Sequence, residues 1–465
     1  MRRKKRSKFL PSLLLLLVLS AIVALWVGFS VGPEPRLSLT SGFDAADEVA
    51  LLGPRNTLTA TALEPERGIG EVQVEFEQEG QARTLGQAAY TFRSPWKPWV
   101  TPGQVQAQLT IEINRDTVPD LHEGAAVVRV TAQRSSGFLR SPDPVVLERS
   151  FTVRLIPPSL EIRSTTHYVA QGGAEVVVYQ VGETASSSGV RVGDWFFRGY
   201  PLPGGGPQER FAFYAVPYDH SELGDLRLVA EDLVANRSEK RFVDRFFPKP
   251  LGRDTVRLSD RFLEKVVPDI LSQTPELQPG DDLLTGYLAI NRDLRKQNRA
   301  ELRELAARTR QEFLWRGPFL PLRGAKATAG FSQRRTYMYE GKPVDTQDHL
   351  GFDLASVARA AVQAANDGVV LRAGWFGIYG NAVVLDHGYG LLSLYGHLSS
   401  ISVTEGEEMI RGQELGRTGA TGLAGGDHLH FAILLHGLPV NPVEWWDDHW
   451  IQDRLRLKLG EALPG

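Results

Sequence analysis

Three short motifs in the C-terminal third of the chain place histidine and aspartate side chains where they could hold a metal ion. The motifs are His349-Leu350-Gly351-Phe352-Asp353, Tyr395-Gly396-His397-Leu398 and Asp427-His428-Leu429-His430-Phe431. Imidazole nitrogens and carboxylate oxygens are the usual ligands of catalytic zinc sites, which keep one position open for water. The residue types therefore predict metal-assisted hydrolysis.

The third motif has the alternation of a β-strand, in which residues two apart point to the same face. His428 and His430 should project together, about 7 Å apart by strand rise. The residues between and after them, Leu429, Phe431 and Ile433, should face the core. Two imidazoles on one face can serve one site if one binds the metal and the other stands beside it.

His349 and Asp353 would supply further ligands from a separate segment. Two histidines and one carboxylate form an open zinc site with water in the fourth position. Zinc lowers the pKa of that water and polarises the scissile carbonyl. A neighbouring histidine that is not a ligand can orient the water or stabilise the oxyanion.

Each motif alone is weak, because His-x-His and His-x-x-x-Asp are both common patterns. Their occurrence together within residues 317–447, a glycine-rich segment, is far more specific. We expect His387 and His436 to be exposed, because they lie beside glycines in apparent turns. The remaining histidines have no companion motif and are given no role: His122, His167, His220 and His449.

Residues 317–447 are predicted to form a β domain that positions these motifs. Alternating and apolar runs predict strands at 368–375, 381–386, 391–396, 414–418 and 428–435. Gly388 and Gly390 would close the hairpin between the second and third strands. Glycines at 419, 422, 425 and 426 predict a loop before the last strand.

The motifs resemble those of the LytM/lysostaphin-type zinc peptidases. The resemblance covers about residues 317–447 and extends to Gly380-Asn381-Ala382-Val383-Val384-Leu385-Asp386-His387-Gly388, to Leu394 before the second motif and to Gly425-Gly426 before the third. It implies a compact antiparallel β domain with a groove over the metal, Zn²⁺. By motif position, it implies that His349, Asp353 and His430 are the zinc ligands. It likewise implies that His397 and His428 are the catalytic histidines that activate water and stabilise the oxyanion.

The usual activity of this family is endopeptidase cleavage of peptidoglycan stems or cross-bridges. Some members have lost metal ligands and activate cell-wall amidases instead. All five positions are filled here, so the resemblance implies competence for zinc binding and hydrolysis. The main departure is Asp427, which precedes the His-x-His motif where the family often has a small residue.

The N-terminal segment predicts export. Residues 9–29 form an uncharged apolar run that, as a helix rising about 1.5 Å per residue, would span roughly 30 Å, the thickness of a bilayer core. Six basic residues within residues 2–8 should keep the N-terminus cytoplasmic. A single-pass signal anchor in the cytoplasmic (inner) membrane, residues 1–30, is favoured over a cleaved signal peptide because the run is long, although Gly28 and Ser30 could flank a cleavage site. Either reading places residues 31–465 on the periplasmic side.

The rest of the chain is predicted to be mainly β. Residues 34–157 and 158–250 show short alternating runs punctuated by Gly, Pro, Asp and Asn, and each is predicted to be an immunoglobulin-like β-sandwich. Residues 256–316 are predicted to be a helical linker with Ser259 as an N-cap and with Pro268 and Pro279 interrupting the pattern. A solvated helix over 281–312 is favoured, and a lid over the active site is the alternative. Residues 448–465 are assigned as a C-terminal tail.

Composition excludes several classes. The chain has no cysteine, which rules out disulfides, thiolate zinc sites and a cysteine nucleophile. The formal net charge of −3 includes the basic N-terminus, so the exported part is acidic and lacks the basic footprint of nucleic-acid binding.

The sequence thus predicts a membrane-anchored zinc endopeptidase that cuts peptidoglycan cross-links, with the β domains available to envelope partners. A regulator that activates an amidase or division partner is the second hypothesis. A peptidase acting on a protein substrate is the third.

Overall fold

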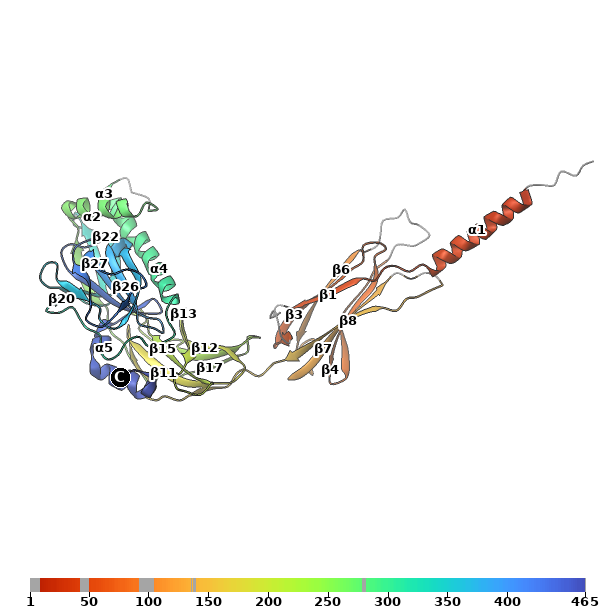
Figure 1. The fold of residues 1–465 in the computed structure, drawn as a ribbon, viewed down its shortest axis with the longest axis horizontal. Helices are drawn as coiled ribbons and strands as arrows, with labels where there is room; N and C mark the ends of the chain where they lie inside the picture. Colours follow the sequence, from red (N-terminus) through yellow and green to blue (C-terminus); the bar gives the residue numbers. More distant parts are fainter. Residues whose placement is uncertain are drawn as a thin grey trace, which may run out of the picture. The chain divides into compact units, whose positions relative to one another are not determined.

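The computed structural model describes residues 9–41, 50–91, 104–134, 136, 139–277 and 282–464. The predicted basic cluster within residues 2–8, Pro279 and Asp281 lie outside these residues. The fold is mainly β, as predicted (Figure 1). The chain divides into two compact units, one of residues 1–157 with 231–237 and one of residues 158–230 with 238–465. Each unit is described by itself.

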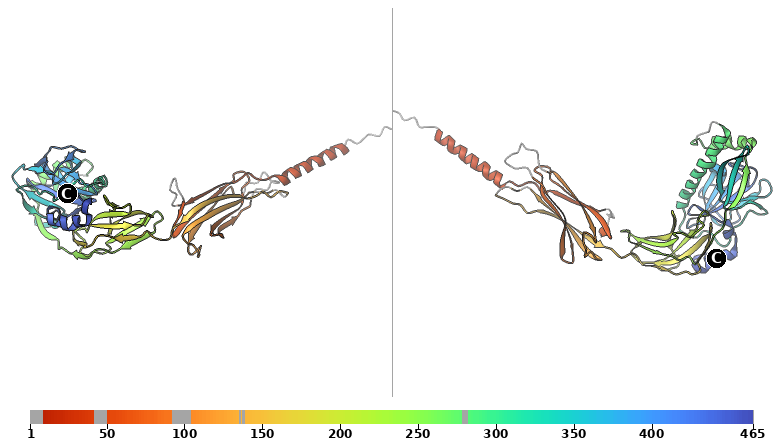
Figure 2. Two further views of the ribbon diagram at one scale, coloured as in Figure 1. Left: turned by 60° about the horizontal axis from the view of Figure 1, so that its bottom comes forward. Right: turned by 180° about the vertical axis from the view of Figure 1, so that it is seen from behind.

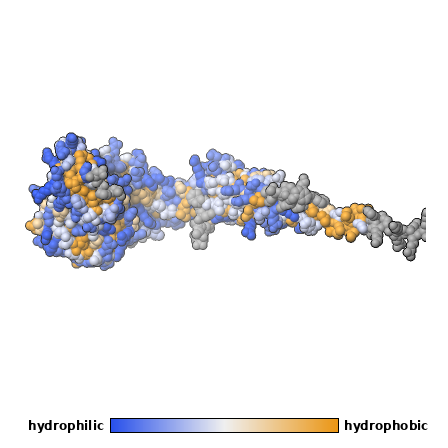
Figure 3. Space-filling model, turned by 90° about the horizontal axis from the view of Figure 1, so that it is seen from above, coloured by the Kyte–Doolittle hydropathy of each residue, from blue (hydrophilic) through white to orange (hydrophobic). Residues whose placement is uncertain are grey.

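The first unit begins with helix α1 (Phe9–Phe29), which coincides with the predicted apolar run. Ser12–Phe29 is long and apolar enough to cross a membrane, and its leucine side chains are exposed rather than packed in a core. These side chains give α1 a hydrophobic surface (Figure 3). A signal sequence near the N-terminus would have the same properties.

The described residues of this unit then form eight strands in two sheets, ordered β1-β3-β6 and β2-β8-β7-β4-β5. Alternate residues of both sheets form one core that includes Leu58, Val74, Phe76 and Phe151. This core fits a sandwich, whereas the immunoglobulin-like type stays a prediction. The strands are β1 (Arg36–Ser41), β2 (Ala50–Leu52), β3 (Arg55–Leu63), β4 (Ile69–Gln78), β5 (Gln81–Ala89), β6 (Gln106–Asn114), β7 (Gly124–Arg134) and β8 (Val145–Val153).

Residues 158–250, called the second β region below, contain two four-stranded sheets, ordered β14-β15-β11-β9 and β13-β12-β16-β17. Strand β10 pairs with β18. Its strands are β9 (Leu160–Ile162), β10 (Tyr168–Ala170), β11 (Ala174–Val181), β12 (Ala185–Val192), β13 (Trp195–Arg198), β14 (Tyr200–Pro201), β15 (Glu209–Ala215), β16 (Arg227–Asp232), β17 (Arg237–Lys240) and β18 (Arg245–Phe247). Figure 2 shows these strands from two further sides.

Helices α2 (Asp260–Gln273), α3 (Leu283–Ala289) and α4 (Arg295–Ala307), with the π-helical turn η1 (Ile290–Leu294), come next. Ser259 caps α2 as predicted, because its side chain accepts a hydrogen bond from Phe262 N. Pro268 was expected to interrupt the helix, and this is wrong: it lies inside α2. A proline inside a helix costs about 3 kcal/mol, which burial of Val266, Val267 and neighbouring apolar residues can offset.

The prediction of a solvated helix is also wrong for α4. Leu302 and Leu305 are buried against Val384 and Leu392 of the C-terminal sheet. Helix α4 therefore covers one face of that sheet, and the exposed charged residues of the segment, such as Lys296, Arg303 and Glu304, lie on its other side.

The C-terminal β domain is built around an antiparallel sheet ordered β20-β23-β30-β27-β26-β25-β28. Three strands have the predicted bounds: β25 (Gly368–Trp375), β26 (Asn381–Asp386) and β29 (Glu414–Thr418). Strand β27 (Leu391–Ile401) is longer than predicted, and β30 (Leu429–Leu435) starts one residue later than predicted. The other strands are β19 (Gly252–Arg257), β20 (Lys326–Ala329), β21 (Gln333–Tyr339), β22 (Lys342–His349), β23 (Phe352–Ala355), β24 (Ala361–Gln363), β28 (Glu408–Met409) and β31 (Leu438–Val440), and a 3₁₀ turn η2 spans Gly377–Tyr379. A separate sheet, β19-β21-β22, leads into the first motif.

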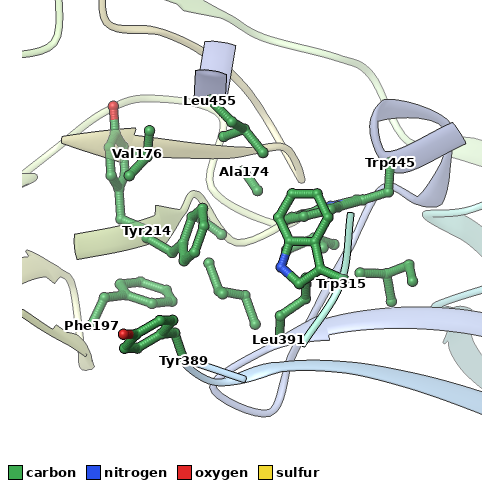
Figure 4. Packing of buried hydrophobic residues seen from close by; sticks show 14 of the residues in the cluster. Ala174, Val176, Phe197, Tyr214, Trp315, Tyr389, Leu391, Trp445 and Leu455 are labelled. Carbon is green, nitrogen blue, oxygen red and sulfur yellow. The ribbon is translucent and has the colours of Figure 1, made fainter. Parts of the chain in front are cut away.

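One hydrophobic core joins the second β region to the C-terminal sheet (Figure 4). Phe211 packs edge-on to Tyr389, with ring centroids 4.9 Å apart, and Trp445 contacts both Phe213 and Trp315. The sheet is followed by helix α5 (Pro442–Trp446). The segment assigned as a tail, residues 448–465, is helical in α6 (Asp448–Trp450), η3 (Ile451–Arg456), α7 (Leu457–Leu459) and η4 (Gly460–Ala462). It enters this core and forms a buried ion pair of Lys458 with Glu175, Nζ to Oε1 2.7 Å.

Replacing Trp445 with alanine should destabilise the whole second unit, because this fully buried ring contacts both of its parts. We expect a loss of about 3–5 kcal/mol. In denaturant unfolding of residues 31–465, the transition of the second unit should shift and that of the first should not. Leu457→Ala, at an exposed position nearby, is the control and should change stability by no more than about 0.5 kcal/mol. Separate transitions for residues 158–250 and 317–447 would contradict the shared core.

Candidate metal centre and active site

The sheet brings the three motifs together. Strand β22 ends at His349, β23 carries Asp353, and the antiparallel pairing of β23 with β30 sets Asp353 opposite His430. On the other side of β30, His430 is opposite Gly396, next to His397. His428 lies just before β30, bridged to Gly419. The predicted alternation is confirmed, since Leu429, Phe431 and Ile433 are buried in the shared core.

His349, Asp353 and His430 form a triangle of donor atoms. His349 Nε2 lies 2.9 Å from Asp353 Oδ1 and 3.1 Å from His430 Nδ1, and His430 Nδ1 lies 3.0 Å from Asp353 Oδ1. Two ligands of a tetrahedral zinc ion are about 3.3 Å apart, given bonds of about 2.0–2.1 Å. The triangle therefore has the right size and donor types for one metal ion.

Hydrogen bonding supports this fit. His349 Nδ1 lies 2.8 Å from Gly330 O and donates its proton there, which leaves Nε2 unprotonated in the neutral ring. That lone pair points at a carboxylate oxygen and at a second imidazole nitrogen. Converging lone pairs repel one another unless a cation or a proton lies among them.

His397 and His428 stand beside the triangle. The loop of residues 419–427 holds both, because His397 Nδ1 donates to Thr421 O and His428 Nδ1 to Gly426 O, each at 2.8 Å. Their ring centroids are 4.8 Å apart, and His428 Nε2 lies 3.6 Å from Asp353 Oδ1. Asp427 fixes the same loop by accepting hydrogen bonds from Thr418 Oγ1 and Arg359 N, so this departure from the family pattern has a structural role.

Burial sets the protonation of these groups. It lowers the pKa of His397 to about 3 and that of His430 to about 4, with neighbouring histidines adding to the effect on His397. Burial opposes ionisation of Asp353, but hydrogen bonds with His349, His428 and His430 outweigh it and hold its pKa well below the usual value. Burial likewise opposes the charged form of His428, but Asp353 outweighs it and raises the pKa of His428. In the absence of metal, His397 and His428, called the two accessory histidines below, thus differ in basicity.

A cavity of about 300 Å³ opens over the donor triangle. Its lining includes Arg335 and Tyr379, and it also includes Phe262 of α2, Tyr287 of α3 and Arg295 of α4. The segment that contains the helices therefore forms part of the cavity wall. No motif or spacing in the sequence pointed to these five residues, because they come from four separate elements and one turn.

The expectation that His387 and His436 are exposed is wrong. His387 is fully buried, with Nε2 2.7 Å from Ser393 Oγ and Nδ1 2.6 Å from Asp367 O. The ring of His436 stacks on Tyr200, with centroids 6.1 Å apart. Both therefore pack the core beside the glycine turns and lie outside the donor triangle.

Comparison with known proteins agrees with this geometry. The sequence model of Peptidase family M23 matches residues 347–442, which contain all five motif residues. The chain carries a LytM-type domain of peptidase family M23. The predicted resemblance is thereby confirmed for this part of the chain.

Three relatives show how far the similarity to M23 proteins extends. The DD-carboxypeptidase/endopeptidase Mpg of Neisseria meningitidis is 45% identical over 96 residues, 20% of this chain and 22% of Mpg. The peptidoglycan DD-endopeptidase ShyA of Vibrio cholerae is 38% identical over 96 residues, 21% and 22% of the two chains. The murein hydrolase activator EnvC of Escherichia coli is 40% identical over 84 residues, 18% and 20% of the two chains. The aligned part spans about a fifth of each relative.

The two accessory histidines of the M23 domain should titrate differently in metal-free protein. We expect the His397 ring to stay neutral to well below pH 5 and the His428 ring to gain its proton above pH 6.5. Because an unfolded chain protonates His397 near pH 6.5, its lowered pKa should also reduce stability as the pH falls from 6.5 towards 3. Histidine ring NMR, assigned with His397→Gln and His428→Gln, measures both values. Titration of His397 near pH 6.5 would contradict the described environment.

Proposed function

We propose that the chain is a membrane-anchored zinc endopeptidase that hydrolyses peptide cross-links of bacterial peptidoglycan. The observation that carries this proposal is the donor triangle of His349, Asp353 and His430, flanked by two histidines whose Nε2 atoms are not used by the backbone. The substrate class comes from Mpg, a DD-carboxypeptidase/endopeptidase, and ShyA, a peptidoglycan DD-endopeptidase.

Zinc is the metal that suits this donor set, two imidazoles and one carboxylate. His349 Nε2, Asp353 Oδ1 and His430 Nδ1 would hold it. When bound, it polarises a carbonyl and makes water a better nucleophile.

His397 and His428 divide the proton chemistry. His397 is neutral, so its Nε2 can accept a proton from the attacking water. His428 has the higher pKa and, when protonated, can donate a hydrogen bond to the developing oxyanion. Environments that push the pKa values of two neighbouring groups apart are typical of acid–base pairs.

The alternative is a regulator with little hydrolysis of its own, which activates an amidase or division partner. The similarity to EnvC favours it. The complete donor triangle favours hydrolysis, because a pure activator does not need three converging ligands. A protein substrate in place of peptidoglycan would use the same residues and differ only in the products.

His349→Ala and His397→Ala should separate metal binding from catalysis. We expect residues 31–465 to bind one zinc and to release muropeptides from purified peptidoglycan. His349→Ala should lose the zinc and the activity, whereas His397→Ala should keep the zinc and lose about 10²–10⁴-fold in rate. Metal analysis and chromatography of the products measure both effects.

The matched control is His449→Ala, which alters an exposed histidine outside the site. It should leave zinc content and rate unchanged. Equal product release by wild type and His349→Ala would contradict the hydrolase. Wild-type protein that releases nothing by itself but stimulates a purified amidase would support the regulator.

For the anchor, we expect the protein to stay in washed inner membranes at the full length of 465 residues, because α1 would remain in the bilayer. Residues 31–465, expressed with a cleavable signal sequence, should instead be released from the periplasm by osmotic shock. Immunoblotting of the fractions compares the two forms. A soluble native protein that begins near residue 31 would show that the segment is a cleaved signal peptide.

A further inference from the structure

Asp353 uses its two carboxylate oxygens for different partners. Oδ1 contacts His349, His430 and His428, whereas Oδ2 accepts a hydrogen bond from Arg335 Nη2 at 3.0 Å. We propose that Arg335 is a positioning residue for the metal site, which holds Asp353 so that Oδ1 alone is directed at the donor triangle. This inference rests on the metal site of the proposed function.

The backbone places Arg335 for this task. Arg335 lies in β21, which pairs with β22 on one side and with β19 on the other. It is opposite Gln347 of β22 and Asp254 of β19. Gln347 is two residues before His349 on β22, so the guanidinium reaches the site from the strand next to that ligand. Asp254 Oδ2 lies 3.9 Å from Arg335 Nε and gives a weaker electrostatic restraint on the far side.

The pair is largely buried. The Arg335 and Asp353 side chains are 17% and 13% exposed. Among the ion pairs of the described residues, Arg335 is the one partner of Asp353 whose charge does not depend on pH, since the others are histidines. Arg335 therefore holds a fixed positive charge at Oδ2 and orients the carboxylate through that hydrogen bond.

Two effects of opposite sign act on metal affinity. The first effect lowers affinity, because the guanidinium charge of Arg335 repels an incoming dication; the carboxylate of Asp353 lies between the two and offsets much of this repulsion. The second effect raises affinity, because the hydrogen bond from Arg335 orients that carboxylate. Loss of the hydrogen bond would let the carboxylate rotate and offer both oxygens. Removal of an outer partner of a metal ligand typically costs roughly 10–100-fold in affinity, so we expect the orienting effect to dominate.

The test compares Arg335→Gln with Arg334→Gln, a matched control on the same strand. Strand alternation points Arg334 to the other face, where it binds Asp348 with two hydrogen bonds of 2.9 and 3.1 Å and is 48% exposed. Metal-free residues 31–465 are titrated with zinc in competition with a chelator. We expect Arg335→Gln to lose roughly 10–100-fold in zinc affinity, Arg335→Lys to recover part of that loss, and Arg334→Gln to match the wild type.

A spectroscopic signature separates positioning from a general loss of structure. With Co²⁺ in place of zinc, the visible absorption of Arg335→Gln should change in intensity because a freed carboxylate alters the coordination. The spectrum of Arg334→Gln should match the wild type. Circular dichroism and the unfolding midpoint confirm that each variant is folded.

The outcomes of this test are distinct from those of the proposed function. Zinc affinity of folded Arg335→Gln within about threefold of wild type, or tighter, with an unchanged Co²⁺ spectrum, would overturn the role of Arg335. Wild-type protein that binds zinc but cuts no peptidoglycan would overturn the peptidase and leave the role of Arg335 standing if Arg335→Gln still loses affinity. Wild-type protein that binds no zinc would overturn both.

Discussion

One atom, Asp353 Oδ1, is the point on which the candidate site depends. Three imidazole nitrogens lie 2.9, 3.0 and 3.6 Å from it. Two of those rings already donate their other proton to a backbone carbonyl, so their facing nitrogens carry lone pairs unless the rings are charged. A buried carboxylate oxygen that faces several nitrogen lone pairs needs a positive charge, a metal ion or a proton, among them. A proton on His428 fills this need in part when metal is absent, because Asp353 raises the pKa of His428. Hydrogen bonds with His349, His428 and His430 in turn lower the pKa of Asp353.

The register of the sheet maintains that convergence. Antiparallel pairing fixes Asp353 opposite His430, and β27 places His397 on the other side of the same strand. His397 itself has a φ of +63°, a left-handed conformation that is uncommon for a residue with a Cβ. The strand also has an irregular register after Leu398, where the loop of residues 419–427 binds the His397 ring. Backbone strain at this position is held by neighbouring contacts and directs the ring into the cavity.

The sequence was informative wherever function and local pattern coincide. The alternation around His430 predicted which residues face the core, and the three motifs predicted which side chains meet. It was uninformative about Arg335, whose bond to Asp353 depends on the pairing of β21 with β22, and about Tyr287, which reaches the cavity from a helix. It was wrong about His387, because a glycine turn does not reveal that the neighbouring ring packs beneath it. The prediction for Pro268 was wrong for a similar reason. The rule that proline ends a helix does not include the free energy gained when Val266 and Val267 are buried.

The folded unit that supports the site is larger than the region matched by the M23 family. That match covers residues 347–442, yet Arg335 and the cavity wall from α2 to α4 precede it, and Leu455 of the C-terminal helices follows it in the shared core. The face of the sheet opposite α4 is buried against Phe211 and its neighbours in the second β region. Removal of either flanking segment would expose apolar surface and lose contacts on which the register of the sheet depends. The sequence outside the M23 match is therefore part of what gives the donor triangle its geometry, and it supplies Phe262, Tyr287 and Arg335 to the wall of the cavity.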